Sequence, residues 1–469
     1  MRRLIPPLPV FLVFLAAGAA GPLSPVSAAG GDRPSLVDAA RNADPDAVRT
    51  ILKQGANVNA PEADGTTALH WASYRDDIQS ADLLIRAGAK VNATNDLGAT
   101  PLWTATQNAS AAMVRRLLQA GANPSAALLS GETVLMAAAH SGNPAIVEQL
   151  VAKGANVNAR AVRGQTALMW AVGQKHVDVV KVLLAHGADV HARSDEWSQV
   201  MAVIPHGLPI YNRAIPHGGD TALMFAARVG DLASARLLLA AGANVNDADA
   251  WGVSATVLAE HSGYVELVEL LLDHGADANA AKAGFTALHE AIMRRDEKIV
   301  AALLAHGADP NTPLRTWTPT RRDSQDFHFG PELVGASPLW LAARFSEPNV
   351  MRLLVKHGAD PLFVHHADYY AGARGEKRTE ATTVLMAATG MSAGTPWVRP
   401  DGGAREALTL DAVKLAAELG VDLNAANTDG RTALDAAKAL KYDTVVTFLS
   451  DKGARPGVPI KKEKASAAN

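Results

Sequence analysis

The hydrophobic residues of this chain recur with a period of about 33 residues, which is too long for one strand or one helix and is typical of a repeat protein. Within each period, a short segment places a leucine and, three residues later, an alanine on one side of a helix, as Leu168 and Ala171 do. A second segment ends in a leucine pair, such as Leu183 and Leu184, shortly before a glycine. The pattern predicts two short amphipathic helices in every period.

Hydroxyl residues and glycines mark where these helices begin and end. A Thr or Ser comes directly before each first helix, where its side chain can accept a hydrogen bond from a free backbone N–H. The predicted N-caps are Thr67, Thr100, Thr133, Thr166, Thr221, Ser254, Thr286, Ser337, Thr383 and Thr432. A glycine follows each second helix, as expected where a helix ends in a left-handed residue. These glycines are Gly55, Gly88, Gly121, Gly154, Gly187, Gly242, Gly275, Gly307, Gly358, Gly420 and Gly453.

Ten copies of the motif that begins with GTTALHWAS at Gly65 follow one another, and a first unit without this opening precedes them, so we count eleven units. Four intervals between the starts of successive copies are longer than the regular period: Gly164 to Gly219, Gly284 to Gly335, Gly335 to Ala381, and Ala381 to Gly430. The surplus is assigned to predicted insertions near 193–218, 312–334, 362–380 and 391–406. The first three fall in the segment between two units, and the fourth falls between the two helices of one unit. Because the register returns after each insertion, we expect the scaffold to continue across all four.

The motif GxTALHxA, the segment VVKVLLAHGADVHA and the regular period resemble the ankyrin repeat. The resemblance covers nearly all of residues 30–456. It implies a mainly α repeat solenoid, in which each unit is a helix-turn-helix plus a β-hairpin and the units stack into a curved array with capping end units. It also implies that the hairpins line one edge of a concave groove, so the first three insertions should project from the same side. In this family the position of His70 and His289 usually bonds toward a neighbouring hairpin.

The two ends of the chain are predicted to lie outside the solenoid. Residues 1–29 carry Arg2 and Arg3, an apolar run and small residues before Ala29, as a signal peptide does. The apolar run is short for a membrane span, although a retained anchor is the alternative. We therefore predict an exported protein, periplasmic or extracellular, without a membrane span once the leader is removed. The basic tail 457–469 is predicted to be disordered.

Aromatic and histidine residues concentrate in the insertions. Our candidate partner-binding residues are Trp197, His206, Tyr211, His217, Trp251, Trp317, Phe327 and Tyr369. They have two interpretations: anchors for a partner, since Trp and Tyr dominate interface energetics, or fasteners that pack each loop onto the solenoid. The sequence IPHG occurs at 204–207 and again at 215–218, and we expect these copies to flank a compact loop that brings His206 and His217 together.

The chain offers no recognisable catalytic, cofactor or metal motif. A net charge of −3 gives no electrostatic reason to expect nucleic acid, and the absence of cysteine excludes thiolate ligands and lipoprotein attachment. The HExxH pattern that starts at His289 fails at Met293. We therefore predict a non-enzymatic scaffold that binds another protein through its concave face and its hairpin-tip insertions. The alternatives are an enzyme or metal-dependent protein with a site built from His206, His217, His365 and His366, and a self-associating scaffold.

Overall fold

The computed structural model of this chain describes residues 35–201, 212–318, 329–371, 376–392, 404–458 and 460. The predicted signal peptide lies outside these residues, as do His206, Tyr211, Phe327 and most of the insertion near 391–406. The described residues contain helices in consecutive pairs, and each pair is one of the eleven predicted units. None of the described helices is long and apolar enough to cross a membrane.

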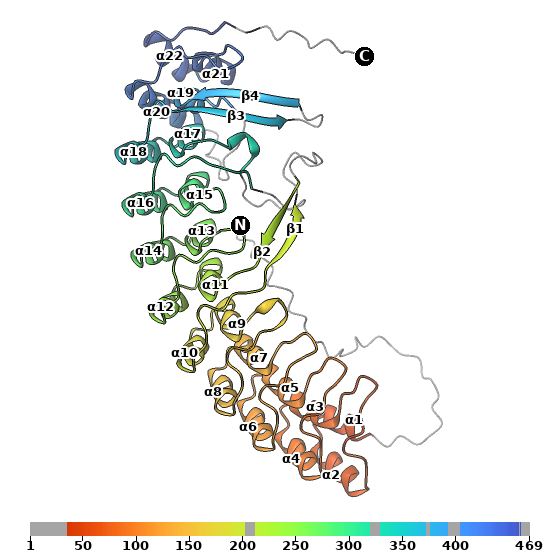
Figure 1. The fold of residues 1–469 in the computed structure, drawn as a ribbon. Coiled ribbons are helices and arrows are strands. Elements are labelled where there is room, and N and C mark those ends of the chain that lie inside the picture. Colours follow the sequence, from red (N-terminus) through yellow and green to blue (C-terminus); the bar gives the residue numbers. More distant parts are fainter. Residues whose placement is uncertain are drawn as a thin grey trace, which may run out of the picture.

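Two rows of helices run along the molecule (Figure 1). The first helices of the units are α1 (Leu36–Arg41), α3 (Ala68–Tyr74), α5 (Pro101–Gln107), α7 (Val134–Ser141), α9 (Ala167–Gly173), α11 (Ala222–Val229), α13 (Ala255–His261), α15 (Ala287–Arg294), α17 (Pro338–Arg344), α19 (Val384–Ala388) and α21 (Ala433–Leu440). The second helices are α2 (Pro45–Lys53), α4 (Ile78–Arg86), α6 (Ala111–Gln119), α8 (Pro144–Ala152), α10 (Val177–Ala185), α12 (Leu232–Ala240), α14 (Val265–Asp273), α16 (Glu297–Ala305), α18 (Pro348–Lys356), α20 (Arg405–Glu418) and α22 (Asp443–Asp451). The predicted solenoid is therefore confirmed.

The predicted helix boundaries follow from capping chemistry. All ten predicted Thr and Ser residues occupy the N-cap of a first helix; for example, Thr100 accepts the N–H of Trp103 at 3.2 Å. All eleven glycines after the second helices have φ between 80° and 91°. No atom lies within 4 Å of a Cβ built at these glycines, so the left-handed backbone alone requires glycine there. Gly252 has a positive φ of 95° as well, and crowding adds to the requirement for glycine there, because a Cβ would lie 2.5 Å from Lys282 Cβ.

The core is shared between units. Each first helix contacts the first helix of the next unit, and each second helix contacts the next second helix. One cluster of buried apolar side chains extends without a break from Leu36 to Ala454. No unit buries its apolar side alone, so the stability of the array depends on contacts between neighbours.

We use the word finger for the segment between the second helix of one unit and the first helix of the next. Backbone hydrogen bonds join the tips of successive fingers. The pairs are Leu129 N–H to Leu97 O (3.0 Å), Val162 N–H to Ser130 O (3.3 Å) and Asp195 N–H to Arg163 O (2.7 Å). These bonds connect the tips of neighbouring fingers between residues 97 and 195.

An asparagine ladder joins the same segments nearer the helices. Asn246 Nδ2 donates to Gly275 O at 3.1 Å, and its Oδ1 accepts the N–H of Asp277 at 2.7 Å. The same pair of bonds to the next unit is made by Asn59, Asn92, Asn158, Asn279 and Asn311. Each ladder residue satisfies two backbone groups of the following unit.

Replacing Asn246 by alanine is expected to lower the free energy of unfolding by about 1 to 3 kcal/mol, because two backbone partners lose their hydrogen bonds together. Urea titration followed by circular dichroism measures the change. His191 occupies the equivalent place in another unit, so the variant His191→Ala is the matched control and should change stability far less. Equal losses in both variants would show that the ladder bonds are not the cause.

Two insertions form antiparallel hairpins on the finger side of the array (Figure 1). In the first, β1 (Trp197–Met201) pairs with β2 (Arg213–His217), with Trp197 opposite His217 and Gln199 opposite Ile215. In the second, β3 (Val364–Ala371) pairs with β4 (Glu376–Thr383). The second IPHG copy thus lies in and just after β2, whereas the first copy lies outside the described residues.

Candidate functional site

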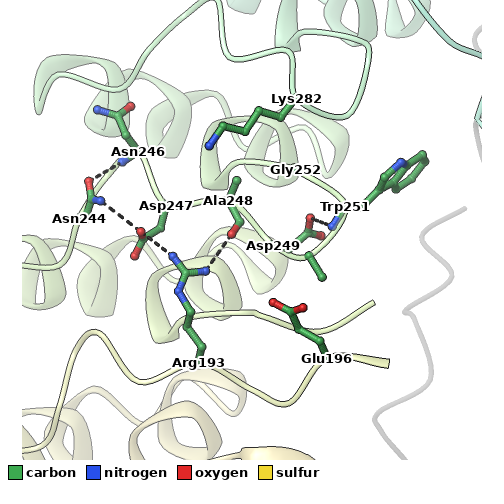
Figure 2. A pocket seen from close by; sticks show the side chains of 11 residues that line it. Arg193, Glu196, Asn244, Asn246, Asp247, Ala248, Asp249, Trp251, Gly252 and Lys282 are labelled. Atoms are coloured by element: carbon green, nitrogen blue, oxygen red, sulfur yellow. Dashed lines mark hydrogen bonds and ion pairs between the residues drawn. The ribbon is translucent and has the colours of Figure 1, made fainter. Parts of the chain in front are cut away.

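The base of the first hairpin is tied to the finger of the following unit. Gly219 N–H donates to Ser194 O at 3.1 Å, so the two ends of the insertion meet. Arg193 reaches beyond this closure, and its Nη1 donates to Gly219 O (2.9 Å) and Ala248 O (2.8 Å). Its Nη2 also lies 2.6 Å from Asp247 Oδ1 (Figure 2). Arg193 therefore clamps the hairpin to the finger that precedes α13.

An open cleft of about 520 Å³ lies between the hairpin base and the neighbouring fingers (Figure 2). Its lining comes from three segments: Arg193 and Glu196 at the hairpin, the finger 244–252, and Lys282 on the next finger. The clamp forms one wall, and Trp251 stands at the opposite rim. The cleft is a shallow polar depression on the finger edge, which suits a side chain or a turn of a partner chain better than an enclosed small molecule.

The two aspartates of the cleft have different hydrogen-bond and ion-pair partners. Asp247 pairs with Arg193, and Asp249 accepts the N–H groups of Trp251 (2.9 Å) and Val253 (2.8 Å). Burial raises the pKa of Asp249, and the two N–H groups partly oppose this effect. Both aspartates therefore shape the finger.

Trp197 is held in a fixed orientation at the base of the hairpin. Its ring stacks on the ring of His217, its partner across the strands, with centroids 4.4 Å apart. The guanidinium carbon of Arg163, from the preceding finger, lies 5.4 Å from the indole centre. The indole is nevertheless 41% exposed. Trp197 therefore combines a fixed position with free surface, as an interface anchor requires.

The far end of the hairpin contacts a finger more than one hundred residues further along the chain. Arg213 lies over the ring of Trp317 at 5.4 Å, and its Nη1 donates to Thr316 Oγ1 at 3.1 Å. Between the two ends, the side chain of Ile215 is buried. The hairpin therefore runs alongside the fingers as far as the unit that follows α16, and is fastened at both ends (Figure 1).

Aromatic rings also connect three successive fingers. The ring of Trp251 lies 5.8 Å from that of Phe285, which lies 5.4 Å from that of Phe329. Phe285 and Phe329 are buried, whereas Trp251 is only partly buried. Trp251 therefore sits at the accessible end of a packed aromatic row.

We name this region the hairpin edge: residues 193–201 and 212–219 with the fingertip residue Arg163 and the finger segments 244–252, 282–285 and 315–318. Four of the predicted partner-binding residues lie on it: Trp197, His217, Trp251 and Trp317. The arginines and the lysine were missed by sequence reasoning: Arg163, Arg193, Arg213, Lys282 and Arg315. Their positions in the repeat were a usable signal, because Arg163, Lys282 and Arg315 all fall at fingertips.

Tyr369 is placed differently from the other candidates. It is buried on the inner face of β3, and its hydroxyl donates to Glu380 Oε1 at 2.7 Å. Ser392 Oγ donates to the other carboxylate oxygen at 2.6 Å. Burial, followed by the bond to Glu380, raises the pKa of Tyr369. In this conformation Tyr369 fastens the β3–β4 hairpin, as the alternative interpretation of these aromatics holds.

The comparisons with known sequences agree with this architecture. The family described as ankyrin repeats in three copies matches residues 36–127, 121–194 and 223–313. Ankyrin repeats in many copies match 168–239, and a single ankyrin repeat matches 334–366. The chain belongs to the ankyrin repeat family. The sequence resemblance is thereby confirmed.

Among curated ankyrin repeat proteins, the chain resembles the ankyrin repeat, SAM and basic leucine zipper domain-containing protein 1 of Dasypus novemcinctus, with 30% identity over 136 residues. That match covers 28% of this chain and 25% of the relative. An ankyrin repeat protein of Rickettsia bellii (strain RML369-C) is 29% identical over 128 residues, covering 23% of this chain and 37% of the relative. The chain thus spans only 25% to 37% of the length of these relatives.

Among solved structures, the human ASB11 ankyrin repeat domain matches with 29% sequence identity and a TM-score of 0.43. The match covers 52% of this chain and 99% of that domain.

Of the two motif histidines, His70 makes the bond that the family resemblance implies, whereas His289 Nε2 makes no hydrogen bond among the described residues. His70 Nε2 donates to Ala99 O of the next unit at 3.0 Å, and burial lowers the pKa of this histidine. Trp103 and Trp340, which occupy the same motif position, are buried between units. Packing between ankyrin units, rather than exposure on the concave face, accounts for these tryptophans.

The histidines proposed for the rival metal site are separated. His365 is buried against α17, and its Nε2 donates to Val334 O at 3.1 Å. His366 is exposed on the opposite face of the same strand, so the two rings cannot approach one ion together. Among the described residues, no three His, Asp or Glu side chains are grouped as metal ligands. His206, the partner predicted for His217, lies outside the described residues.

Proposed function

We propose that this protein is an exported, non-catalytic scaffold that binds another protein through its concave face and the hairpin edge. Ankyrin repeats are generally protein–protein interaction modules, and they make up most of this chain. The sequence of residues 1–29 supports the proposed export. The observation that supports the binding site best is Trp197, which is held between His217 and Arg163 and is still 41% exposed.

The physical basis of this function is preorganisation. A hairpin fastened at both ends, on a solenoid whose units are already packed, has little conformational freedom left to lose on binding. Most of the free energy gained from contacts with the partner therefore contributes to affinity, because little conformational entropy is lost on binding. Trp197, Trp251 and Trp317 are the proposed anchors, since buried aromatics carry most of the energy of ordinary interfaces.

The decisive variant removes residues 196–217. This stretch is as long as the surplus of the interval from Gly164 to Gly219 over the regular period, so Asp195 joins Gly218 and an ordinary finger is restored. Affinity capture from the envelope of the source organism compares this variant with the intact chain. We expect a partner that the intact chain retains and the shortened chain loses.

Once such a partner is purified, alanine at Trp197 and Trp251 should weaken its binding by about tenfold or more, with the melting temperature unchanged. Binding is measured by isothermal titration calorimetry, and melting by circular dichroism. A melting temperature that falls in step with affinity would show that these side chains only fasten the hairpin. If the variant that lacks residues 196–217 retained the partner as well as the intact chain does, the hairpin edge would not be the binding site.

A further inference from the structure

The tips of the fingers change character along the solenoid. The early tips carry acidic or apolar residues, as at Asp64, Asp96 and Leu129. Three later tips carry a cation, namely Arg163, Lys282 and Arg315, whereas the tip that precedes α13 carries Asp249 and Trp251. All three cations are exposed, although the whole chain has a net charge of −3. The basic character is therefore local to the hairpin edge.

The charges of these three cations are not neutralised by carboxylates of the described residues. Within the described residues, none of Arg163, Lys282 and Arg315 has a carboxylate within ion-pair distance. The contrast with nearby Arg160 is direct, because its Nη2 lies 2.8 Å from Asp195 Oδ1. Arg163 is additionally held over the indole of Trp197, which fixes the guanidinium beside a proposed anchor.

Few carboxylates of the hairpin edge can neutralise these cations. Asp195 and Asp247 are paired with Arg160 and Arg193, and Asp249 accepts backbone N–H groups of its own finger. Glu196 is the remaining carboxylate that lines the cleft. The surface therefore carries an excess of unpaired positive charge beside two partly exposed indoles.

The arrangement of these groups is linear. The fingertip of Arg315 follows that of Lys282 directly, since Arg315 N–H donates to Gly284 O at 2.8 Å. The β1–β2 hairpin lies along the same edge from Trp197 to the contact between Arg213 and Thr316. A ligand that reaches all these groups must be extended, and carboxylates bonded to guanidinium and ammonium groups supply complementary charge.

We propose that the hairpin edge binds an extended, acidic segment of the partner protein. Its carboxylates pair with Arg163, Lys282 and Arg315, and its apolar side chains lie against Trp197 and Trp251. This inference rests on the proposed function and specifies the chemistry of the partner. Nucleic acid fits less well, because an acidic protein with three such cations lacks the broad basic surface that a polyanion requires.

The test uses two fluorescein-labelled peptides of fourteen residues, one alternating Glu and Thr and the other alternating Lys and Thr, each with one central Phe. Fluorescence anisotropy measures their binding to the purified protein. We expect the acidic peptide to bind about tenfold more tightly or better, and its affinity to fall as salt is added. Equal binding of both peptides would overturn the proposal.

The triple variant Arg163→Glu, Lys282→Glu, Arg315→Glu should lower the affinity for the acidic peptide by about tenfold or more. The matched control, Arg115→Glu, Arg236→Glu, Lys356→Glu, makes the same change in net charge at exposed residues of second helices and should leave binding near that of the native chain. If both triple variants lost the same affinity for the acidic peptide, the change in net charge alone would explain the effect and the proposal would be wrong. A single-stranded oligonucleotide that binds as tightly as the acidic peptide, and is lost with the fingertip variant, would assign the surface to nucleic acid instead.

The two proposals can fail separately. If a partner is captured through residues 196–217 and the fingertip variant still binds it, the function stands and the acidic chemistry is wrong. If the acidic peptide binds as expected while no partner depends on residues 196–217, the proposed function is wrong and the charge complementarity stands.

Discussion

Replacing Trp340 by alanine is expected to lower the free energy of unfolding by about 3 to 5 kcal/mol, the largest effect among the substitutions considered. Trp340 lies on α17 and is completely buried. Its ring centroid lies 4.2 Å from that of His365, and its Nε1 donates to Thr382 Oγ1 at 3.2 Å. Alanine would leave a cavity between units and a buried hydroxyl without its donor, and these costs add.

The loss should also be local. α17 contacts α15 on one side and α19 on the other, so a cavity at Trp340 weakens two of the neighbour contacts that hold the array together. Urea unfolding followed by circular dichroism gives the change in stability, and amide hydrogen exchange shows where it falls. We expect faster exchange in α17 and α19 than in the native chain, with α3 and α5 unchanged.

Trp197→Ala is the matched control, because it removes the same side chain from an exposed position on the hairpin. It should lower stability by less than about 1 kcal/mol. If the two alanine variants were equally destabilised, the hairpin would contribute to the solenoid as much as the core does. That result would contradict the interpretation of Trp197 as a partly exposed anchor for a binding partner.

The sequence predicted the repeating part of this fold because its chemistry is local. A Thr or Ser accepts an N–H within the same turn, and a glycine after each second helix has the same left-handed φ in all eleven units. Each such feature involves residues only a few positions apart. Repetition then identified the features, since an accidental match does not recur eleven times.

The course of the insertions was not predictable in the same way. The β1–β2 hairpin is positioned by Arg193 at one end and by the contact of Arg213 with Thr316 at the other. Arg213 and Thr316 are 103 residues apart in the chain. Nothing in the local pattern of residues 193–218 indicates these contacts. The sequence therefore predicted the insertion and its aromatic residues, but not the residues that hold the hairpin in place.

Buried acids are the other feature that sequence reasoning missed, and here the repeat contained a signal. Glu260 is fully buried on α13, at the motif position that holds Ala139 and Val172 in other units. Burial, and then the neighbouring Glu290, raise the pKa of Glu260 well above its usual range. Ser73, Thr106 and Thr389 occupy the same position and are buried too, whereas Lys438 in the last unit is exposed. A carboxylate at this position in an inner unit therefore predicts burial.

The stability of the protein is expected to fall as pH rises from about 6.5 to 8, and Glu347 is a principal cause. It occupies the N-cap of α18 but makes no capping bond, unlike Asp296 at the same position of the preceding unit. Burial raises the pKa of Glu347 from 4.5 to about 8, against the opposing charge of Arg295, whose Nη1 lies 3.8 Å away. Glu297 acts in the same direction as burial.

The sign of the effect follows from proton binding. Between pH 4.5 and about 8 the folded protein holds a proton on Glu347 that the unfolded chain has lost, so stability is greatest below this window and decreases as pH rises through it. The slope for one such group is at most about 1.4 kcal/mol per pH unit. Burial lowers the pKa of His289 from 6.5 to about 4, which makes stability rise with pH, but only below 6.5. Measurements from pH 6.5 to 9 therefore isolate the acids.

Glu347→Gln should flatten this decline and make the protein more stable than the native chain at pH 9, by about 1 to 3 kcal/mol, because no buried charge has to form. Urea titrations at pH 6.5, 7.5, 8.5 and 9 measure the profile. Glu266→Gln, at an exposed position in the first turn of α14, is the control and should keep the native slope. A glutamine variant with the native slope would mean that Glu347 is ionised in the folded protein and that Arg295 outweighs its burial. The double variant with Glu260→Gln should flatten the profile further, since Glu260 titrates in the same sense.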